Sequence, residues 1–306
     1  MIRNLTLAGL SLLLVLALAI GFVGCDDSDG GNGGIANISQ AELVEKVLAA
    51  NENATTCKFD MDMTMKMDGE SMGQSFGMDI SMDGDGIIDN TNEEMKMDMN
   101  MSMDMDMGFM GDMDTNMDME MYYIDNTMYS KMSGIEGVPA QWTKMEMPGT
   151  WESQDMVSQQ TELLEAAELS ISDGGKVNGA SCYKVKMTPD MAKLYDIMLQ
   201  QPGLGGGLGA GDLPEDMDMS ELMDIIKDFS VVQWYAKDTF YPMKAEMEMN
   251  MVISPEEMGM PEEEGTMEMD MAMTMNFKDY DKSVSINLPD EAKGAMDMTG
   301  IMDDSW

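Results

Sequence analysis

Methionine alternates with polar, mostly acidic residues over long stretches of this chain. The alternation fills several runs between residues 59 and 123 and returns at 247–253 and 267–277. Successive side chains of a β-strand point to opposite faces of the sheet, so a period of two places the thioethers on one face and the carboxylates on the other. The pattern predicts a large antiparallel sheet with one methionine face and one acidic face.

Turn signals divide the first part of this pattern into strands. We expect strands at about 56–67, 72–82, 94–107, 113–124 and 128–132. Between them, Asp68-Gly69, the run Asp83-Gly84-Asp85-Gly86 and Asp125-Asn126 are typical turn sequences. The sequence thus predicts a meander of neighbouring strands.

A short helix is predicted before the first strand. Ser39 and Glu42 have the spacing of a capping box, and Ile38 and Leu43 are placed as a hydrophobic staple. The helix should have about three turns and end near residues 51–53.

Helical spacing replaces the alternation later in the chain. We expect a helix over about 150–169, one that begins with Thr188 as its cap and Pro189 at its first position, and one that carries Ile226 and Phe229. A strand at 182–187 separates the first two, and three strands close the chain. Each helix has one apolar stripe, and the surface available to receive it is the methionine face. The predicted class is therefore α+β.

Composition narrows the possible functions. A chain of 306 residues with 44% hydrophobic residues can bury one sizeable core, so we expect a single folded domain. Its formal net charge of −41 repels phosphate backbones and other copies of the chain, which argues against nucleic acid and favours a monomer. Histidine is absent, so no Ser/His/Asp or Cys/His site can exist. We expect no enzymatic activity and no cofactor.

The first 24 residues have the features of a secretion signal. Arg3 is followed by an apolar run that ends at Phe22, and Gly24 precedes Cys25. The sequence Phe22-Val23-Gly24-Cys25 resembles a bacterial lipobox, which implies cleavage before Cys25 and lipidation of its sulfur. An uncleaved membrane anchor is the alternative. We expect a lipoprotein signal peptide at 1–24 and a cell-membrane protein anchored on the extracytoplasmic side. Residues 25–35 would be the lipidated cysteine and a flexible tether, and residues 36–306 the folded domain.

Two late segments resemble the LolA/LppX-like superfamily of bacterial envelope lipid carriers. They are Gln233 to Lys244, which contains Trp234, Asp238 and Tyr241-Pro242, and the closing run from Val284 to Ala292. The resemblance implies a strongly curved antiparallel half-barrel with helices packed on its concave face, which would hold a hydrophobic or lipidic small molecule or an acylated protein. The methionine richness departs from the usual Leu, Val and Phe lining of that superfamily.

The cysteines fit an extracytoplasmic location. With Cys25 lipidated, Cys57 and Cys182 remain as an even pair, and we expect them to form a disulfide. Two unpaired thiols, buried or metal-binding, are the alternative.

The methionine face is the candidate binding surface. Methionine is flexible and polarizable, so a methionine lining can adapt to different apolar ligands. The expected ligand-lining residues are Met61, Met63, Met65, Met97, Met99, Met101, Met103, Met119, Met121, Met249, Met251, Met269, Met271 and Met273.

Other uses of methionine stay open. Thioethers are soft ligands that select Cu(I) or Ag(I), and they are reversibly oxidised to sulfoxides. A Cu(I)/Ag(I)-binding or oxidant-scavenging lipoprotein is therefore the main alternative, although the regular repeat of methionine along whole strands singles out no metal site. Methionine used only as a core residue is the least specific explanation.

Overall fold

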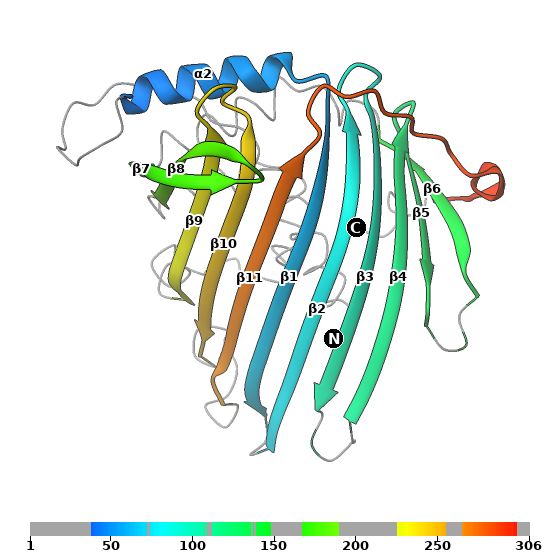
Figure 1. Cartoon of the computed structure of the whole chain (residues 1–306). Coiled ribbons are helices and arrows are strands. Elements are labelled where there is room, and N and C mark those ends of the chain that lie inside the picture. The colour runs from blue at the N-terminus through cyan, green and yellow to red at the C-terminus, as the bar shows by residue number, and fades with distance from the viewer. Residues whose placement is uncertain are drawn as a thin grey trace. The chain divides into compact units, whose positions relative to one another are not determined.

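The computed structural model describes residues 38–71, 74–106, 108, 112–135, 137, 139–147, 167–189, 225–254 and 265–298. These residues are mostly β-strand (Figure 1). The elements are α2 Gln40–Asn53, β1 Thr56–Ser71, β2 Gln74–Asp89, β3 Glu94–Asp106, β4 Asp112–Ile124, β5 Thr127–Ser133, β6 Gln141–Glu146, β7 Ala167–Val177, β8 Ala180–Pro189, β9 Ile226–Ala236, β10 Pro242–Ile253, β11 Met267–Lys278, the 3-10 helix η2 Asp290–Gly294, and β12 Met296–Asp297.

Hydrogen bonding orders the strands as β12-β6-β5-β4-β3-β2-β1-β11-β10-β9-β8-β7 in one 12-stranded sheet. The two ends of this order, β12 and β7, are not paired with each other in the described chain, so the sheet is open. The described part contains a single α-helix, α2. The expectation of an α+β domain with several helices packed on the sheet was therefore wrong, and the fold is mainly β.

Contacts within the chain define two compact units, which we describe separately. The meander unit comprises the described residues of 53–67, 76–153 and 272–306. It contains the long antiparallel run β1 to β6 and the C-terminal half of β11, with β12 added parallel to β6. The hairpin between β4 and β5 confirms the predicted turn at Asp125-Asn126. Both residues have positive φ, 50° and 59°, as a two-residue hairpin of the type I′ class requires.

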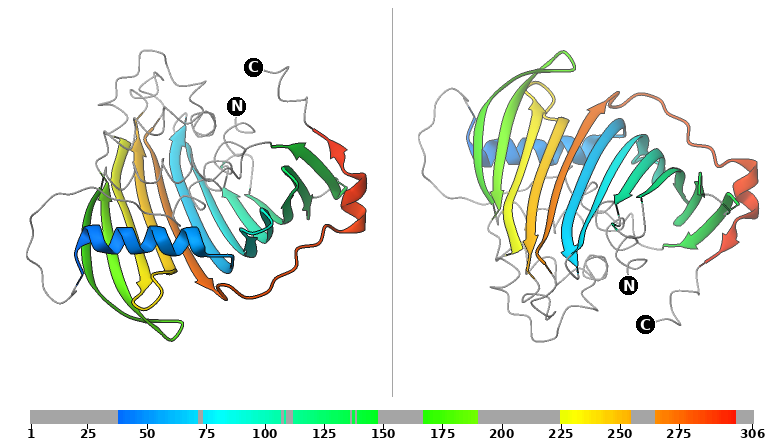
Figure 2. Two further views of the ribbon diagram at one scale, coloured as in Figure 1. Left: turned by 90° about the horizontal axis from the view of Figure 1, so that it is seen from above. Right: turned by 90° about the horizontal axis from the view of Figure 1, so that it is seen from below.

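The helix unit comprises the described residues of 1–52, 68–75 and 154–271. Helix α2 begins as predicted, because the backbone N–H of Glu42 donates a 3.2 Å hydrogen bond to Ser39 Oγ. Its buried residues Leu43, Val44 and Val47 pack with Val185 of β8. Figure 2 shows α2 lying across the strands of its unit. The capping box and the hydrophobic stripe together explain why this predicted helix forms.

The described parts of the three later predicted helices are strand, except Ile225, which is helical. Residues 167–169 belong to β7, Thr188 and Pro189 end β8, and Ile226 and Phe229 lie in β9. The remainder of each predicted helix lies outside the described residues. Leu169 and Ile171 also satisfy a period of two, and pairing with β8 satisfies their backbone groups. Over such short windows the two periods cannot be distinguished, and long-range strand pairing decides the structure.

Two other predictions concern the turns and the N-terminus. Asp68-Gly69 and the run from Asp83 to Gly86 were expected as turns, but they lie within β1 and β2. The predicted signal peptide, Cys25 and the tether lie outside the described residues. Within those residues, no helix has the length and apolar character needed to cross a membrane.

Candidate functional site

Register brings the methionines of neighbouring strands together in rows. In the meander unit, Met101 of β3 lies directly opposite Met82 of β2 and Met117 of β4. Met99 is likewise opposite Met119, which in turn faces Met132 of β5. We call this side of the meander unit, formed by the odd-numbered residues of β1, β3 and β4 and the even-numbered residues of β2, the methionine face. The alternation in the sequence is thus converted into a two-dimensional array of thioethers.

Two glycines interrupt the array on β2. Gly84 and Gly86 lie opposite Met99 and Met97. A β-carbon on Gly84 would be 2.6 Å from the carbonyl oxygen of Asp98 and 2.9 Å from Met99 Cγ, and one on Gly86 would be 2.3 Å from Phe59 Cζ. The glycines therefore leave room for the Met99 and Phe59 side chains to lie close against the sheet. This close approach explains why a run that predicts a turn is a strand.

Most of the predicted lining residues are buried, but in two separate units. Those with at most 8% exposure in the meander unit are Met61, Met63, Met65, Met97, Met99, Met101, Met103, Met121 and Met273. Met119 is half-buried in the same unit. Burial of one such side chain contributes about 1.5–3 kcal/mol, so the face is also a major part of the core. Phe59, Ile80 and Met82 are buried on the same side and were missing from the predicted set, although they belong to the same alternating runs.

The remaining predicted lining residues belong to the helix unit. Met271 is buried, and Met249, Met251 and Met269 are half-buried. Met249 pairs with Phe229 and Met251 with Ile226, so this part of the lining is mixed rather than purely methionine.

A buried polar pair lies beside α2 in the helix unit. The Tyr235 hydroxyl donates a hydrogen bond to Gln233 Oε1, and both residues are at most 2% exposed. Burial raises the pKa of the Tyr235 hydroxyl well above its ordinary value. The phenol therefore stays neutral and acts as a hydrogen-bond donor in this core.

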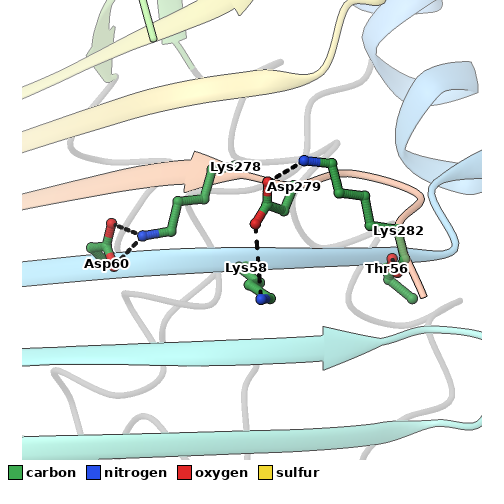
Figure 3. A network of polar contacts seen from close by, with 6 residues as sticks. All are labelled: Thr56, Lys58, Asp60, Lys278, Asp279 and Lys282. Carbon is green, nitrogen blue, oxygen red and sulfur yellow. Dashed lines mark hydrogen bonds and ion pairs between the residues drawn. The ribbon is translucent and has the colours of Figure 1, made fainter. Parts of the chain in front are cut away.

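The opposite face of the meander unit carries the charges. Lys278 Nζ donates a 2.7 Å hydrogen bond to Asp60 Oδ1, and Asp279 lies between Lys58, at 3.8 Å, and Lys282 (Figure 3). These side chains are roughly one-third to two-thirds exposed, so the pairs contribute little to stability.

Carboxylates also lie opposite one another on this face. Asp104 of β3 pairs in register with Asp79 of β2 and Asp114 of β4. The hydrogen bond with Asp114, followed by the charge of Asp114, raises the pKa of Asp104. A shared proton relieves the repulsion between the two carboxyl groups.

The C-terminal segment covers part of this charged face. Tyr122 and Trp142, whose ring centroids are 5.9 Å apart, pack with Ile286 and Ala292. Tyr122 lies opposite Lys96 and therefore on the side away from the methionines. Within the described residues of the meander unit, η2 therefore packs on the charged side and not on the methionine face.

The two described cysteines are free thiols. Cys57 is buried in β1 of the meander unit and Cys182 is buried in β8 of the helix unit, and because the two units are described separately, the disulfide between them stays a prediction. Burial, with a smaller effect of the Asp281 charge, raises the pKa of Cys57 to about 12. Burial also raises the pKa of Cys182. Both are therefore protonated and unreactive at neutral pH.

Ordinary metal-binding clusters are missing from the described residues. No group of three or more His, Cys, Asp or Glu side chains there could hold a metal ion. What the site offers chemically is a soft, uncharged thioether surface on one side of a sheet that is charged on its other side.

Comparison with protein families identifies the chain. Residues 39–297 match a single model, that of a family of unknown function (DUF6612). The chain belongs to this family. The match begins at the cap of α2 and ends with β12, so DUF6612 includes every element described above. No curated protein matches the chain.

Several solved structures are distantly similar to this DUF6612 protein. A β-barrel-like DUF1849 protein from Brucella abortus is 9% identical, with a TM-score of 0.30 over 74% of this chain and 100% of its own. A DUF1329 protein from Desulfovibrio piger is 11% identical, with a TM-score of 0.19 over 79% and 92%. A domain from Vibrio parahaemolyticus assigned to outer membrane lipoprotein sorting is 9% identical, with a TM-score of 0.19 over 74% and 87%. Similarities this low carry no argument about function.

Proposed function

We propose that this DUF6612 protein is a membrane-anchored extracytoplasmic lipoprotein without enzymatic activity, which binds a hydrophobic or lipidic ligand on its methionine face. The observation that carries the proposal is the array of thioethers in register across β2, β3 and β4. The lipobox-like sequence that ends at Cys25 and the resemblance of residues 233–244 and 284–292 to LolA/LppX-like carriers support the location and the ligand class.

The chemistry of the face suits an apolar ligand of variable shape. A methionine side chain has three rotatable bonds and no branch, so neighbouring thioethers can repack around a guest at little cost. Met99 and Met101 are 4% and 6% exposed, whereas Met119 is half-buried and Met132 is 42% exposed. The exposure of the methionine side chains therefore increases from β3 to β5. We expect an acyl chain to enter at the more exposed side, on β5.

The charges on the other side of the sheet limit where a ligand can bind. Asp79, Asp104 and Asp114 lie there in one row, and their charges repel a fatty acid or a phospholipid headgroup. An anionic lipid should therefore bind by its chain and leave its headgroup in solvent at the margin.

Uptake of cis-parinaric acid, whose fluorescence rises in an apolar site, tests the proposal. The full chain in detergent micelles should take up the probe above the detergent background, and Met119→Leu should do so equally well, because leucine keeps the surface apolar. Met119→Gln has nearly the same length but adds an amide that needs hydrogen bonds, and it should weaken uptake several-fold. Equal uptake by the two variants, with unchanged circular dichroism, would remove the methionine face from the binding site. No uptake by any form would overturn the function.

A further inference from the structure

One methionine row stands out from the others by its burial. Met82, Met101 and Met117 lie directly opposite one another on three neighbouring strands. Met82 and Met101 are 7% and 6% exposed, and Met117 is half-buried. Two other rows also contain three methionines, but each ends in a much more exposed residue, Met132 at 42% or Met113 at 49%.

The spacing of this row matches a three-sulfur metal site. Neighbouring strands are about 4.8 Å apart, and directly opposed β-carbons are about 4.5–5.5 Å apart. Three sulfurs around one ion are about 4 Å apart for metal–sulfur bonds of about 2.3 Å, the length seen with zinc and cysteine. The outer thioethers of Met82 and Met117 need only lean toward Met101, which their unbranched side chains permit.

The surroundings of the row select a soft, monovalent ion. Its neighbours on the same face are Ile80, Met103 and Thr115 on one side and Gly84, Met99 and Met119 on the other, so the Thr115 hydroxyl is the one side-chain oxygen among these neighbours. Three neutral thioethers favour Cu(I) or Ag(I) over Zn²⁺ or Ca²⁺, which prefer thiolate, imidazole or oxygen ligands.

Negative charge behind the row favours a cation there. On the opposite face, Asp83 and Asp118 flank Asn100 in the adjacent row, and Asn100 Nδ2 donates a 3.0 Å hydrogen bond to Asp83 Oδ2. Two carboxylates one sheet thickness away attract a buried monovalent ion without coordinating it. This attraction offsets part of the desolvation cost of the ion.

We propose that Met82, Met101 and Met117 form a trigonal all-thioether site for Cu(I) or Ag(I). The site lies on the same face as the proposed hydrophobic-ligand site but differs from it in chemistry, because replacing these residues with leucine abolishes thioether coordination while keeping the face apolar. The ion enters from the half-buried Met117, and the two buried thioethers complete its coordination.

Anaerobic titration of the full chain with Cu(I), in competition with bathocuproine disulfonate, tests the site. The wild-type chain should bind one Cu(I) ion more tightly than any further Cu(I) ions. The variant Met82→Leu/Met101→Leu/Met117→Leu should lose this tightly bound ion. The matched control is Met187→Leu/Met247→Leu/Met271→Leu, which removes three buried thioethers from the helix unit. It should keep the tight ion. X-ray absorption of the loaded wild-type chain should show only sulfur at about 2.3 Å.

Three results would overturn the inference. They are a wild-type chain that binds no Cu(I) against the competitor, two triple variants that retain the same number of tight ions, and an absorption spectrum that shows nitrogen or oxygen ligands. Because volume-conserving swaps of methionine for leucine cost little stability, both variants should fold, and circular dichroism checks that they do. Probe uptake by the wild-type chain separates the two hypotheses: failure to bind Cu(I) would overturn only the metal site, and failure to take up cis-parinaric acid would overturn only the proposed function.

Discussion

Gly86→Ala should destabilise the meander unit by about 1–3 kcal/mol, the usual cost of overpacking a close-packed core. The new β-carbon would be 2.3 Å from Phe59 Cζ and 2.9 Å from the carbonyl oxygen of Lys96. The carbonyl is held by the sheet, and the Phe59 ring is only 3% exposed, so neither can move away freely. Alanine itself would contribute about 0.4–1 kcal/mol in the favourable direction by restricting the unfolded chain. The clash should therefore outweigh this gain, so that Gly86→Ala lowers the free energy of unfolding.

A double-mutant cycle with Phe59→Leu tests this explanation by urea unfolding followed by circular dichroism. The smaller leucine removes the ring that the new methyl group meets, so the double variant should be more stable than the sum of the single effects by about 1 kcal/mol. Gly294→Ala is the control, because a β-carbon there meets no atom within 4 Å. The reasoning fails if Gly86→Ala unfolds at the wild-type urea midpoint, or if it costs the same with Phe59 and with leucine at position 59.

Three further predictions concern titration and the helix unit. Burial holds the pKa of the Cys57 thiol at about 12 in the folded state against an ordinary 9.0, so the thiol should react with iodoacetamide at pH 8 only in urea. The folded state should also lose up to about 4 kcal/mol between pH 9.0 and 12, a loss that Cys57→Ala removes. The pKa of Asp104 is raised by Asp114, so this pair should destabilise the fold as pH rises through that pKa. Asp104→Asn should therefore raise the thermal midpoint at pH 7, and no rise would contradict the repulsion between Asp104 and Asp114. Leu43→Ala should cost about 2–5 kcal/mol in urea unfolding, because Leu43 lies on the buried side of α2 and is only 2% exposed.

The meander was predictable from the sequence because its signal is local and repeated. Strands β3, β4 and β5 begin and end within one or two residues of the predicted bounds, and the two-residue turn at Asp125-Asn126 was identified by its composition. A period of two is enough to predict that the methionines of each strand share one face, and this prediction does not require knowing which strands pair. The cap at Ser39 also carried enough local information to place α2.

The errors arose where distant parts of the chain decide the local structure. Gly84 and Gly86 are turn residues by composition, and only the approach of Phe59 and Met99 makes them strand residues. The segment around Leu169 satisfies both a helical and a strand period, and pairing with β8 selects the strand. Cysteine parity predicts a disulfide between Cys57 and Cys182, and this pairing stays a prediction because it depends on the placement of two separate units, which parity does not contain. The exposure difference among the methionine rows likewise appears only once the register is known.

Native mass spectrometry tests the central claim most directly. The full chain would be isolated from the envelope of its host in a mild detergent and released from the micelle inside the spectrometer. The account predicts a fraction of the protein that carries an additional lipid or acyl mass beyond the anchor expected on Cys25, and lipid extraction would identify it. A chain that carries only its covalent anchor, and that takes up no fatty acid when offered one, would contradict the proposed function.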